Sequence, residues 1–357
     1  MVRRWRRCLP LPPAVQRPLR SLAYVGGVAG GLDVEWRRDL HMSPTSHGIK
    51  WVDGALLASE RTNRVVRLDP LAGEPIWEAS VDGPWGSLAV GNGVGVYVNQ
   101  RGQATCLELA SGAVRWVASV PRGYVAIVGS AVLFGGWRGY SPLSGRDLAS
   151  GEPLWSRSRS ENDALLWPLP TAEGALVTAR GSVEMQLIEP RSGAVQQRWT
   201  LPDPVPSGDL DEVLSKTMDG LPIFRLGEAG VAMLLPSGVE VVWQHPTALS
   251  HASPAVHDRH LWLSDTSGPV VVDLGTRTSH ACPLQEGVAP GVVCDSSGAL
   301  FAGRAGVVVH ISPDGAVTDR KVLSRRSVAV VGGGDGLAYL ALKGELICLR
   351  LGSPSAC

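Results

Sequence analysis

A short unit recurs along this chain and limits the folds open to it more than any other feature. In its clearest form it spans ten residues, with an acidic residue in second place, a glycine in sixth place and a tryptophan at the end. Three such copies occupy residues 68–77, 107–116 and 146–155. Because a period of about 40 residues is typical of a four-stranded propeller blade, the repeat predicts a ring of such blades.

Weaker copies continue the pattern on both sides of these three. Two looser copies end at Trp199 and Trp243, and upstream only the end of the unit is present, at Trp36. Two degenerate copies lie at 272–278 and 311–317. The six tryptophans of the unit follow one another at intervals of 39 to 44 residues, so the period holds from Trp36 to Trp243.

The segments between the units have the pattern of short β-strands. Apolar or alternating runs lie between glycine-rich turns, and no segment keeps a helical period, which predicts an all-β protein. Glycine supplies the positive φ that a turn between antiparallel strands often needs, and tryptophan offers a large flat surface to bury between blades. The clearest runs are 55–59, 94–98, 132–134, 261–264 and 337–342.

The unit resembles the repeat of the quinoprotein-like (PQQ-like) β-propeller family, which has the form leucine–aspartate–x–x–threonine–glycine–x–x–x–tryptophan. The resemblance extends over residues 33–351. It implies blades of four strands, A to D from the centre to the rim, in which the unit forms the hairpin between strands C and D. The best matches are Asp69, Gly73 and Trp77; Glu108, Gly112 and Trp116; and Asp147, Gly151 and Trp155.

Counting these hairpins predicts a single eight-bladed β-propeller at 33–351. Residues 33–40 form a D-like strand and 345–351 a C-like strand, and pairing them completes an eighth blade and covers two open strand edges. Seven blades is the alternative if one degenerate unit is misread. A basic, proline-rich tail at 1–32, expected to be disordered, precedes the propeller, and a short tail at 352–357 follows it. The seven C–D hairpins lie at 69–77, 108–116, 147–155, 189–199, 236–243, 273–281 and 312–320.

Charge and hydropathy add little about partners. The chain carries 33 Lys and Arg and 33 Asp and Glu, so net charge gives no specific signal for nucleic acid. No run reaches the roughly 18 apolar residues of a membrane helix. Prolines at 10, 12 and 13 interrupt any apolar signal segment, and Cys8 lacks the lead-in of a lipoprotein cleavage site. We therefore expect a monomeric, cytoplasmic propeller without a membrane segment.

Quinone-dependent alcohol dehydrogenases share this fold, and full resemblance to them would imply a quinone over a bound calcium, beside a disulfide between adjacent cysteines. The cysteines here, at 8, 106, 282, 294, 348 and 357, include no adjacent pair and no CxxC. We also recognise no convergent set of Glu, Asn and Asp to supply oxygen ligands to calcium. The sequence therefore predicts no cofactor, no metal and no quinone-dependent activity.

The B–C turns and the D–A connections of a propeller share one face, at the mouth of the central channel, where binding usually takes place. Six of the eight predicted B–C turns carry a basic residue. We predict a ring of positive charge, with Trp85 and Trp137 beside it, that attracts a protein partner or an anionic ligand. The alternative is that the basic residues are ordinary polar turn residues and that the tryptophans pack between blades. The six are Arg61, Arg101, Arg138, Arg180, Arg304 and Lys343.

One segment departs from the repeat. Residues 201–220 lengthen the interval between Trp199 and Trp243 and include several acidic side chains. We predict an elongated D–A loop there, on the mouth face, because loops inserted on a repeat scaffold often carry function.

The leading interpretation is a non-catalytic binding scaffold. The alternative is an enzyme with its site in the channel, a lyase or cyclase of a biosynthetic pathway, with His47, His251 and Glu212 as candidate catalytic residues. His257 and His260 are spaced as a turn pair but belong to the opposite face, so we assign no metal site. A third interpretation is an assembly or sensor domain resembling the outer-membrane assembly lipoproteins of this fold, against which the missing export signal counts.

Overall fold

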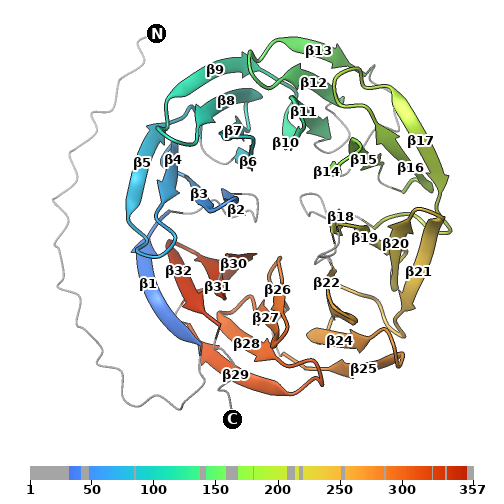
Figure 1. Ribbon diagram of the computed structural model, residues 1–357. Coiled ribbons are helices and arrows are strands. Elements are labelled where there is room, and N and C mark those ends of the chain that lie inside the picture. The colour runs from blue at the N-terminus through green and yellow to red at the C-terminus, as the bar shows by residue number, and fades with distance from the viewer. Residues whose placement is uncertain are drawn as a thin grey trace, which may run out of the picture.

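The computed structural model is a ring of eight antiparallel, four-stranded sheets around a central axis (Figure 1). The prediction of an all-β, eight-bladed propeller is confirmed, and the seven-bladed alternative is wrong. No helix within the described residues is long and apolar enough to cross a membrane. The structure describes residues 32–41, 48–83, 86–136, 142–157, 168–179, 181–206, 214–216, 220–250, 254–284, 287–323, 325–333 and 336–351.

The first four blades follow the chain from the axis to the rim, so strands A to D of each are consecutive. Blade 1 comprises β2 (Ile49–Val52), β3 (Ala55–Glu60), β4 (Arg64–Leu68) and β5 (Pro75–Ser80). Blade 2 comprises β6 (Gly86–Gly91), β7 (Val94–Asn99), β8 (Gln103–Glu108) and β9 (Val114–Ser119). Blade 3 comprises β10 (Gly123–Val128), β11 (Ala131–Gly136), β12 (Ser144–Asp147) and β13 (Pro153–Ser156). Blade 4 comprises β14 (Leu169–Pro170), β15 (Ala175–Thr178), β16 (Glu184–Ile188) and β17 (Val195–Thr200).

Blades 5 to 7 continue the same order. Blade 5 comprises β18 (Leu214–Lys216), β19 (Pro222–Leu226), β20 (Gly230–Leu235) and β21 (Gly238–Gln244). Blade 6 comprises β22 (Ala255–His257), β23 (His260–Ser264), β24 (Pro269–Asp273) and β25 (Thr278–Ala281). Blade 7 comprises β26 (Val293–Asp295), β27 (Gly298–Ala302), β28 (Val307–Ile311) and β29 (Val317–Val322). The prediction that 201–220 is one long loop is wrong, because β18 within it is the inner strand of blade 5.

Blade 8 is assembled from both ends of the propeller. Its inner strands are β30 (Ser327–Gly332), β31 (Leu337–Leu342) and β32 (Glu345–Arg350), and its outer strand is β1 (Asp33–Asp39). β1 pairs antiparallel with β32, from Asp33 opposite Arg350 to Asp39 opposite Glu345. The predicted closure of the last blade by an N-terminal strand is therefore confirmed, and it satisfies two strand edges that would otherwise be open.

The core of the molecule lies between blades. All six residues of β3, β7 and β31 are buried, whereas the outer strand β1 alternates exposed and half-buried residues. A middle strand packs against a neighbouring sheet on each face, so both of its faces are apolar, while an outer strand covers the core on one face only. Each apolar cluster accordingly joins two blades; Leu56 and Val66 of blade 1, for example, pack with Tyr339 of blade 8.

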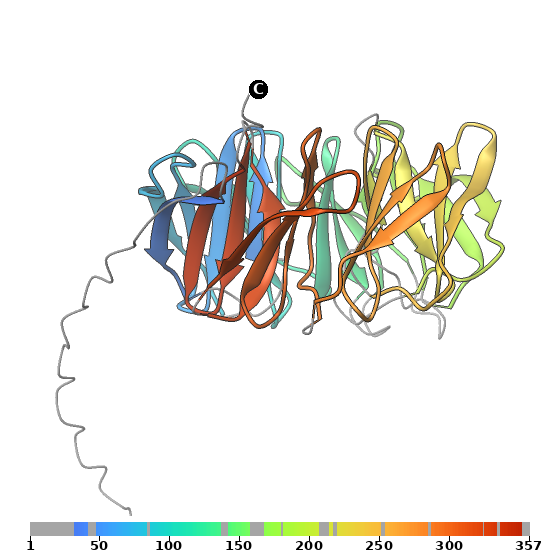
Figure 2. The ribbon, with the colours of Figure 1, turned by 90° about the horizontal axis from the view of Figure 1, so that it is seen from below.

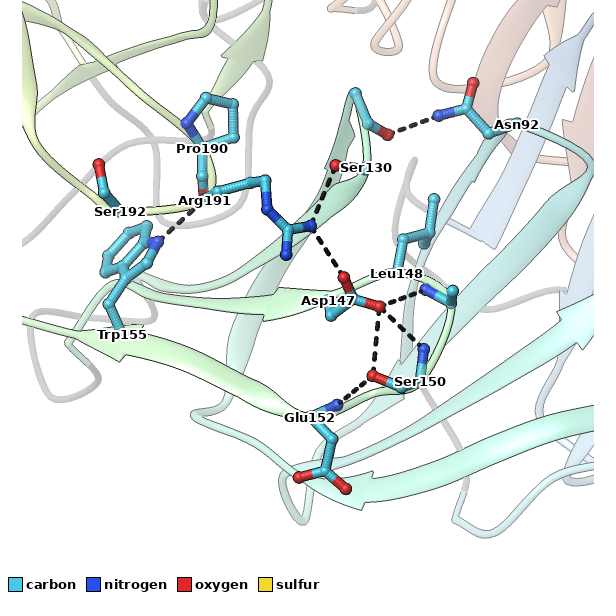
Figure 3. A network of polar contacts seen from close by, with 12 residues as sticks. Asn92, Ser130, Asp147, Leu148, Ser150, Glu152, Trp155, Pro190, Arg191 and Ser192 are labelled. Carbon is cyan, nitrogen blue, oxygen red and sulfur yellow. Dashed lines mark hydrogen bonds and ion pairs between the residues drawn. The ribbon is translucent and has the colours of Figure 1, made fainter.

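The tryptophan of the repeat forms a hydrogen bond between neighbouring blades at the junctions of blades 8 and 1, 1 and 2, 2 and 3, and 3 and 4. The indole Nε1–H of Trp77, on the outer strand of blade 1, donates to the carbonyl oxygen of Leu109 in the C–D turn of blade 2, at 2.7 Å. This bond satisfies the one polar atom of a half-buried ring, as burial of an indole requires. The equivalent bonds are Trp36 to Pro70 (2.9 Å), Trp116 to Leu148 (2.9 Å) and Trp155 to Pro190 (2.8 Å, Figure 3).

The glycine of the repeat lies against that same tryptophan. Gly112 has a φ of +72°, and a Cβ atom placed on it would lie 2.7 Å from Cδ2 of Trp77. The residue therefore needs both the left-handed backbone that glycine tolerates and the space that only glycine leaves. Gly73, Gly151 and Gly193 have the same φ range and the same contact with Trp36, Trp116 and Trp155.

The acidic residue in second place of the unit organises the turn itself. Oδ1 of Asp69 accepts hydrogen bonds from the backbone N–H groups of Leu71 and Ala72, both at 2.8 Å. Asp147 caps its own turn in the same way (Figure 3). Short acidic side chains suit this role because they can accept bonds from the backbone two and three residues ahead. The turn is thereby held in the shape that presents the glycine to the tryptophan.

The degenerate copies keep the inter-blade contact with other residues. His280, on the outer strand of blade 6, packs on Gly315 in the C–D turn of blade 7, where an added Cβ would meet His280 Cβ at 2.3 Å. The side chain of Arg277, in the C–D turn of blade 6, donates to the carbonyl oxygen of Val242 in blade 5. The ring therefore stays continuous where the repeat is hardest to see in the sequence.

Substitution of Gly112 by alanine should destabilise the propeller more than the same change at Gly54. Both glycines have a positive φ, +72° and +76°, but an added Cβ on Gly54 meets nothing within 4 Å. Both variants incur the cost of a left-handed alanine, roughly 1–2 kcal/mol, and only Gly112→Ala adds crowding against Trp77, roughly 1–3 kcal/mol more. The measurement is the urea midpoint of unfolding of each variant. Equal midpoints would show that the tryptophan contact contributes nothing.

Candidate functional site

The two faces of the ring carry different connections. Successive strands of a blade run in opposite directions, so the B–C turns and the D–A connections share one face, which we call the mouth face (Figures 1 and 2). The A–B and C–D turns share the opposite face, and Leu32 and Leu351 also lie on that side, at the start of β1 and the end of β32.

Four of the predicted binding residues fall in B–C turns of the mouth face and are exposed: Arg61, Arg101, Arg304 and Lys343. They follow strands β3, β7, β27 and β31 respectively. Their role in binding stays a prediction. The other candidates lie outside the described residues: the binding candidates Trp85, Trp137, Arg138 and Arg180, and the catalytic candidates His47, Glu212 and His251.

The D–A connections add three exposed arginines that the sequence analysis missed. Arg122 lies between β9 and β10, and Arg325 and Arg326 lie between β29 and β30. A scan restricted to B–C turns could not find them. The signal was present in the sequence, since each follows the expected end of an outer strand by a few residues.

The described part of the mouth face is not uniformly basic. Arg101 lies 3.8 Å from Asp82, and Arg325 lies 3.7 Å from Asp39, so part of the positive charge is balanced locally. The B–C turns of blades 5 and 6 carry Glu228 and Asp265 in place of a basic residue. Within the described turns and connections, exposed basic residues therefore lie over blades 7, 8, 1 and 2 and the connection into blade 3, while the exposed Glu228 lies over blade 5.

A buried histidine–aspartate contact lies on the mouth face, between blades 5 and 6. Nε2 of His245 is 3.5 Å from Asp265, and Nδ1 of His245 accepts a hydrogen bond from Nε1–H of Trp243 at 3.4 Å. Burial alone would raise the pKa of Asp265, but hydrogen bonds from Ser267, Gly268 and His245 hold it below its ordinary value. Because indole nitrogen is a donor only, Trp243 occupies the ring nitrogen that a catalytic histidine would need for its nucleophile. The pair therefore ties blades 5 and 6 together and is not a catalytic dyad.

A buried arginine reinforces the same junction. Arg225 is 2% exposed, and its Nη2 donates to the carbonyl oxygens of Glu228 at 2.9 Å and Leu249 at 3.0 Å. These carbonyls belong to the B–C turn of blade 5 and to the connection into blade 6. The charge of Arg225 thus fixes two mouth segments to each other and is not presented to a ligand.

A comparison with family models decides the family of the chain. The model described as outer membrane protein assembly factor BamB matches residues 32–133 and 61–279, which together make up more than half of the chain. The chain belongs to this family of PQQ-like repeat β-propellers. A comparison with curated proteins gives no match.

Solved structures of PQQ-like and other propellers share the fold. BamB from Moraxella catarrhalis is 16% identical, with a TM-score of 0.71 over 89% of this chain and 97% of that chain. The computationally designed Ika8 protein is 10% identical, with a TM-score of 0.68 over 87% and 98%. A europium-containing methanol dehydrogenase is 11% identical, with a TM-score of 0.60 over 90% and 93%. Identities this low establish the fold and leave the activity to be argued from the residues.

The side of the channel formed by blades 1 to 5 of this PQQ-like propeller has a mainly apolar lining. A cavity of about 180 Å³ lies among the inner strands of blades 1 to 5, and Lys50 is the one lining residue with an ionisable side chain. Within the described residues, no three His, Cys, Asp or Glu side chains are grouped so that they could hold a metal ion. The lining comprises Lys50, Val52, Leu88, Ala89, Val90, Val125, Ala126, Ile127, Pro168, Leu169, Pro170 and Leu214.

A single buried histidine with polar neighbours lies toward the opposite face, in blade 7. His310 is buried, with Nδ1 2.6 Å from Thr318 Oγ1 and Nε2 3.4 Å from Ser297 Oγ. The hydroxyl of Ser297 donates to Asp295 at 2.6 Å, so the carboxylate binds the serine and not the histidine. This order is the wrong one for a Ser–His–Asp triad, in which the carboxylate orients the imidazole.

Replacement of His310 by glutamine should remove a pH dependence of stability. Burial lowers the pKa of His310, although Asp295 and Asp319 oppose the shift. As the pH falls, His310 is therefore protonated in the unfolded chain before it is protonated in the folded protein. The free energy of unfolding decreases as the pH drops below the unfolded pKa of about 6.5, and it stops decreasing below the lower pKa of the folded state. Urea midpoints measured from about pH 7.5 to about pH 5.5 should fall less steeply in H310Q than in the wild type.

The control is H41Q, which removes an exposed histidine and leaves His310 in place. It should keep the wild-type slope. If H310Q and the wild type lose stability in parallel, His310 is not the group responsible.

Proposed function

We propose that this PQQ-like propeller is a non-catalytic scaffold that binds a protein partner through basic residues of its mouth face. The observation that carries the proposal is the gathering of exposed Arg and Lys side chains on adjacent turns of that face, with Arg304, Arg325, Arg326 and Lys343 on two neighbouring blades. Such a patch raises the association rate of a complementary acidic surface and orients it.

A protein partner fits this surface better than a small anionic ligand. The basic side chains stand on exposed turns, whereas small-molecule sites are concave and bury most of the ligand. The cavity of the channel has that concave form, but its described lining is apolar apart from Lys50. The exposed basic side chains and the enclosed cavity are therefore in different places, so no described site combines both for a small anion.

The family comparison supports a role in protein assembly. The matched family is named for an assembly factor, BamB, and a factor of that kind acts by binding other proteins. The closed ring needs no second copy to complete a blade, which supports a monomeric scaffold. The cytoplasmic location and the channel-sited lyase or cyclase stay predictions, the latter resting on His47, His251 and Glu212.

Charge reversal on the mouth face should abolish partner capture. The immobilised wild type, R101E/R304E and the control R259E/R320E are compared for proteins retained from native extract, quantified by mass spectrometry. Arg259 lies in an A–B turn of the opposite face and Arg320 on the rim, so the control changes the net charge equally at a distance from the mouth. We expect a partner retained by the wild type and the control and reduced about tenfold or more by R101E/R304E, the size typical of lost charge complementarity.

Retention of the same proteins by all three forms would contradict the mouth-face scaffold. Thermal unfolding of each form ensures that a loss of capture reflects the surface and not the fold.

A further inference from the structure

We propose that the partner segment bound by the mouth face is a short, extended, carboxylate-rich stretch of protein, and that it lies along a basic arc on blades 7 and 8. The basic arc comprises Arg304, Arg325, Arg326 and Lys343. This inference rests on the proposed function and names the chemistry of its partner. It differs from a ring of charge around the whole mouth, because it assigns binding to one quarter of the ring.

The arc is one continuous surface. The backbone N–H of Leu323 donates to the carbonyl oxygen of Gly306 at 2.8 Å, which joins the connection between blades 7 and 8 to the B–C turn that carries Arg304. The backbone N–H of Lys343 donates to the carbonyl oxygen of Arg326 at 2.9 Å, which joins the same connection to the B–C turn of blade 8. The three segments that carry the basic arc are therefore held side by side by their backbones.

All four side chains of the arc are exposed, and their charges are only partly balanced. Arg325 donates to the carbonyl oxygen of Gly344 at 2.9 Å and lies 3.7 Å from Asp39. Glu345, at the start of β32, is already paired with Arg37 at 3.4 Å. The arc thus offers Arg304, Arg326 and Lys343 for contact, while Arg325 binds the connection to blade 8.

The distribution of charge favours a narrow acidic segment over a broad anionic surface. A membrane or a long nucleic acid laid across the mouth would also meet the exposed Glu228, in the B–C turn of blade 5, which would repel it. A nucleic acid also needs a longer basic track than three exposed side chains. A short acidic segment can follow the arc and avoid Glu228.

The residue types of the arc suit carboxylates. A guanidinium group binds a carboxylate through two parallel hydrogen bonds, and an ammonium group adds a mobile point charge. Arginines on two neighbouring segments present two such forks, so successive acidic side chains of one extended chain can be bound at once. The interaction is exposed and therefore sensitive to salt.

The test uses a fluorescein-labelled octaglutamate peptide and the full chain, with binding followed by fluorescence anisotropy. The arc variant is R326E/K343E, and the matched control is R259E/R320E, which reverses two exposed charges away from the mouth face, in an A–B turn and on the rim. We expect the arc variant to weaken binding about tenfold or more and the control to change it less than about threefold, because charges beyond a Debye length are screened. Added salt should weaken wild-type binding.

Three results would overturn the arc. The first is that octaglutamate does not bind the wild type. The second is that both double variants weaken octaglutamate binding equally. The third is that labelled oligothymidylate or phosphatidylserine vesicles bind the wild type more tightly than octaglutamate does and no longer bind R326E/K343E. The last result would assign the arc to phosphate groups. If partner capture depends on the mouth face but R326E/K343E binds octaglutamate as the wild type does, this inference is wrong and the proposed scaffold function is retained. If R326E/K343E loses octaglutamate but partner capture does not depend on the mouth face, the proposed function is wrong and the arc is retained as a binding site for acidic peptides.

Discussion

The docking of a tryptophan from one blade onto the C–D turn of the next is the contact on which the ring depends. The indole satisfies its N–H on a backbone carbonyl and covers a glycine whose backbone no other residue adopts easily. Four junctions within the described residues use it, and one of them, Trp36 onto the turn of blade 1, joins blade 8 to blade 1. These junctions position blades 8, 1, 2, 3 and 4 relative to one another, and so position the mouth-face turns that those blades carry.

The fold could be predicted because the repeat encodes a contact between blades as well as a strand pattern. Regular tryptophan spacing predicted the blades, and two unpartnered strands predicted the closure by β1. The sequence did not predict that His280 replaces a tryptophan at one junction, because an imidazole in a strand has no distinctive spacing. The inner strand β18 was missed because three residues between acidic and polar segments carry too short a pattern to register.

The candidate site was predictable in part. The turns that carry Arg61, Arg101, Arg304 and Lys343 followed from the strand order, but the uneven charge around the mouth did not. That unevenness depends on partners far away in sequence, such as Asp39 beside Arg325. The sequence also gives no sign that Arg225 is buried on backbone carbonyls and so contributes no surface charge. Burial and pairing of a charge are properties of the folded chain.

The closure of blade 8 also has a consequence for the order of folding. Asp33 pairs with Arg350, so the first strand of the propeller finds its partner only after almost the whole chain has been synthesised. Contacts of such long sequence separation form slowly. During that interval β1 has no neighbouring strand to pair with, and the growing molecule is an open arc of blades. The step that completes the ring is therefore also the period in which this protein is most exposed to aggregation.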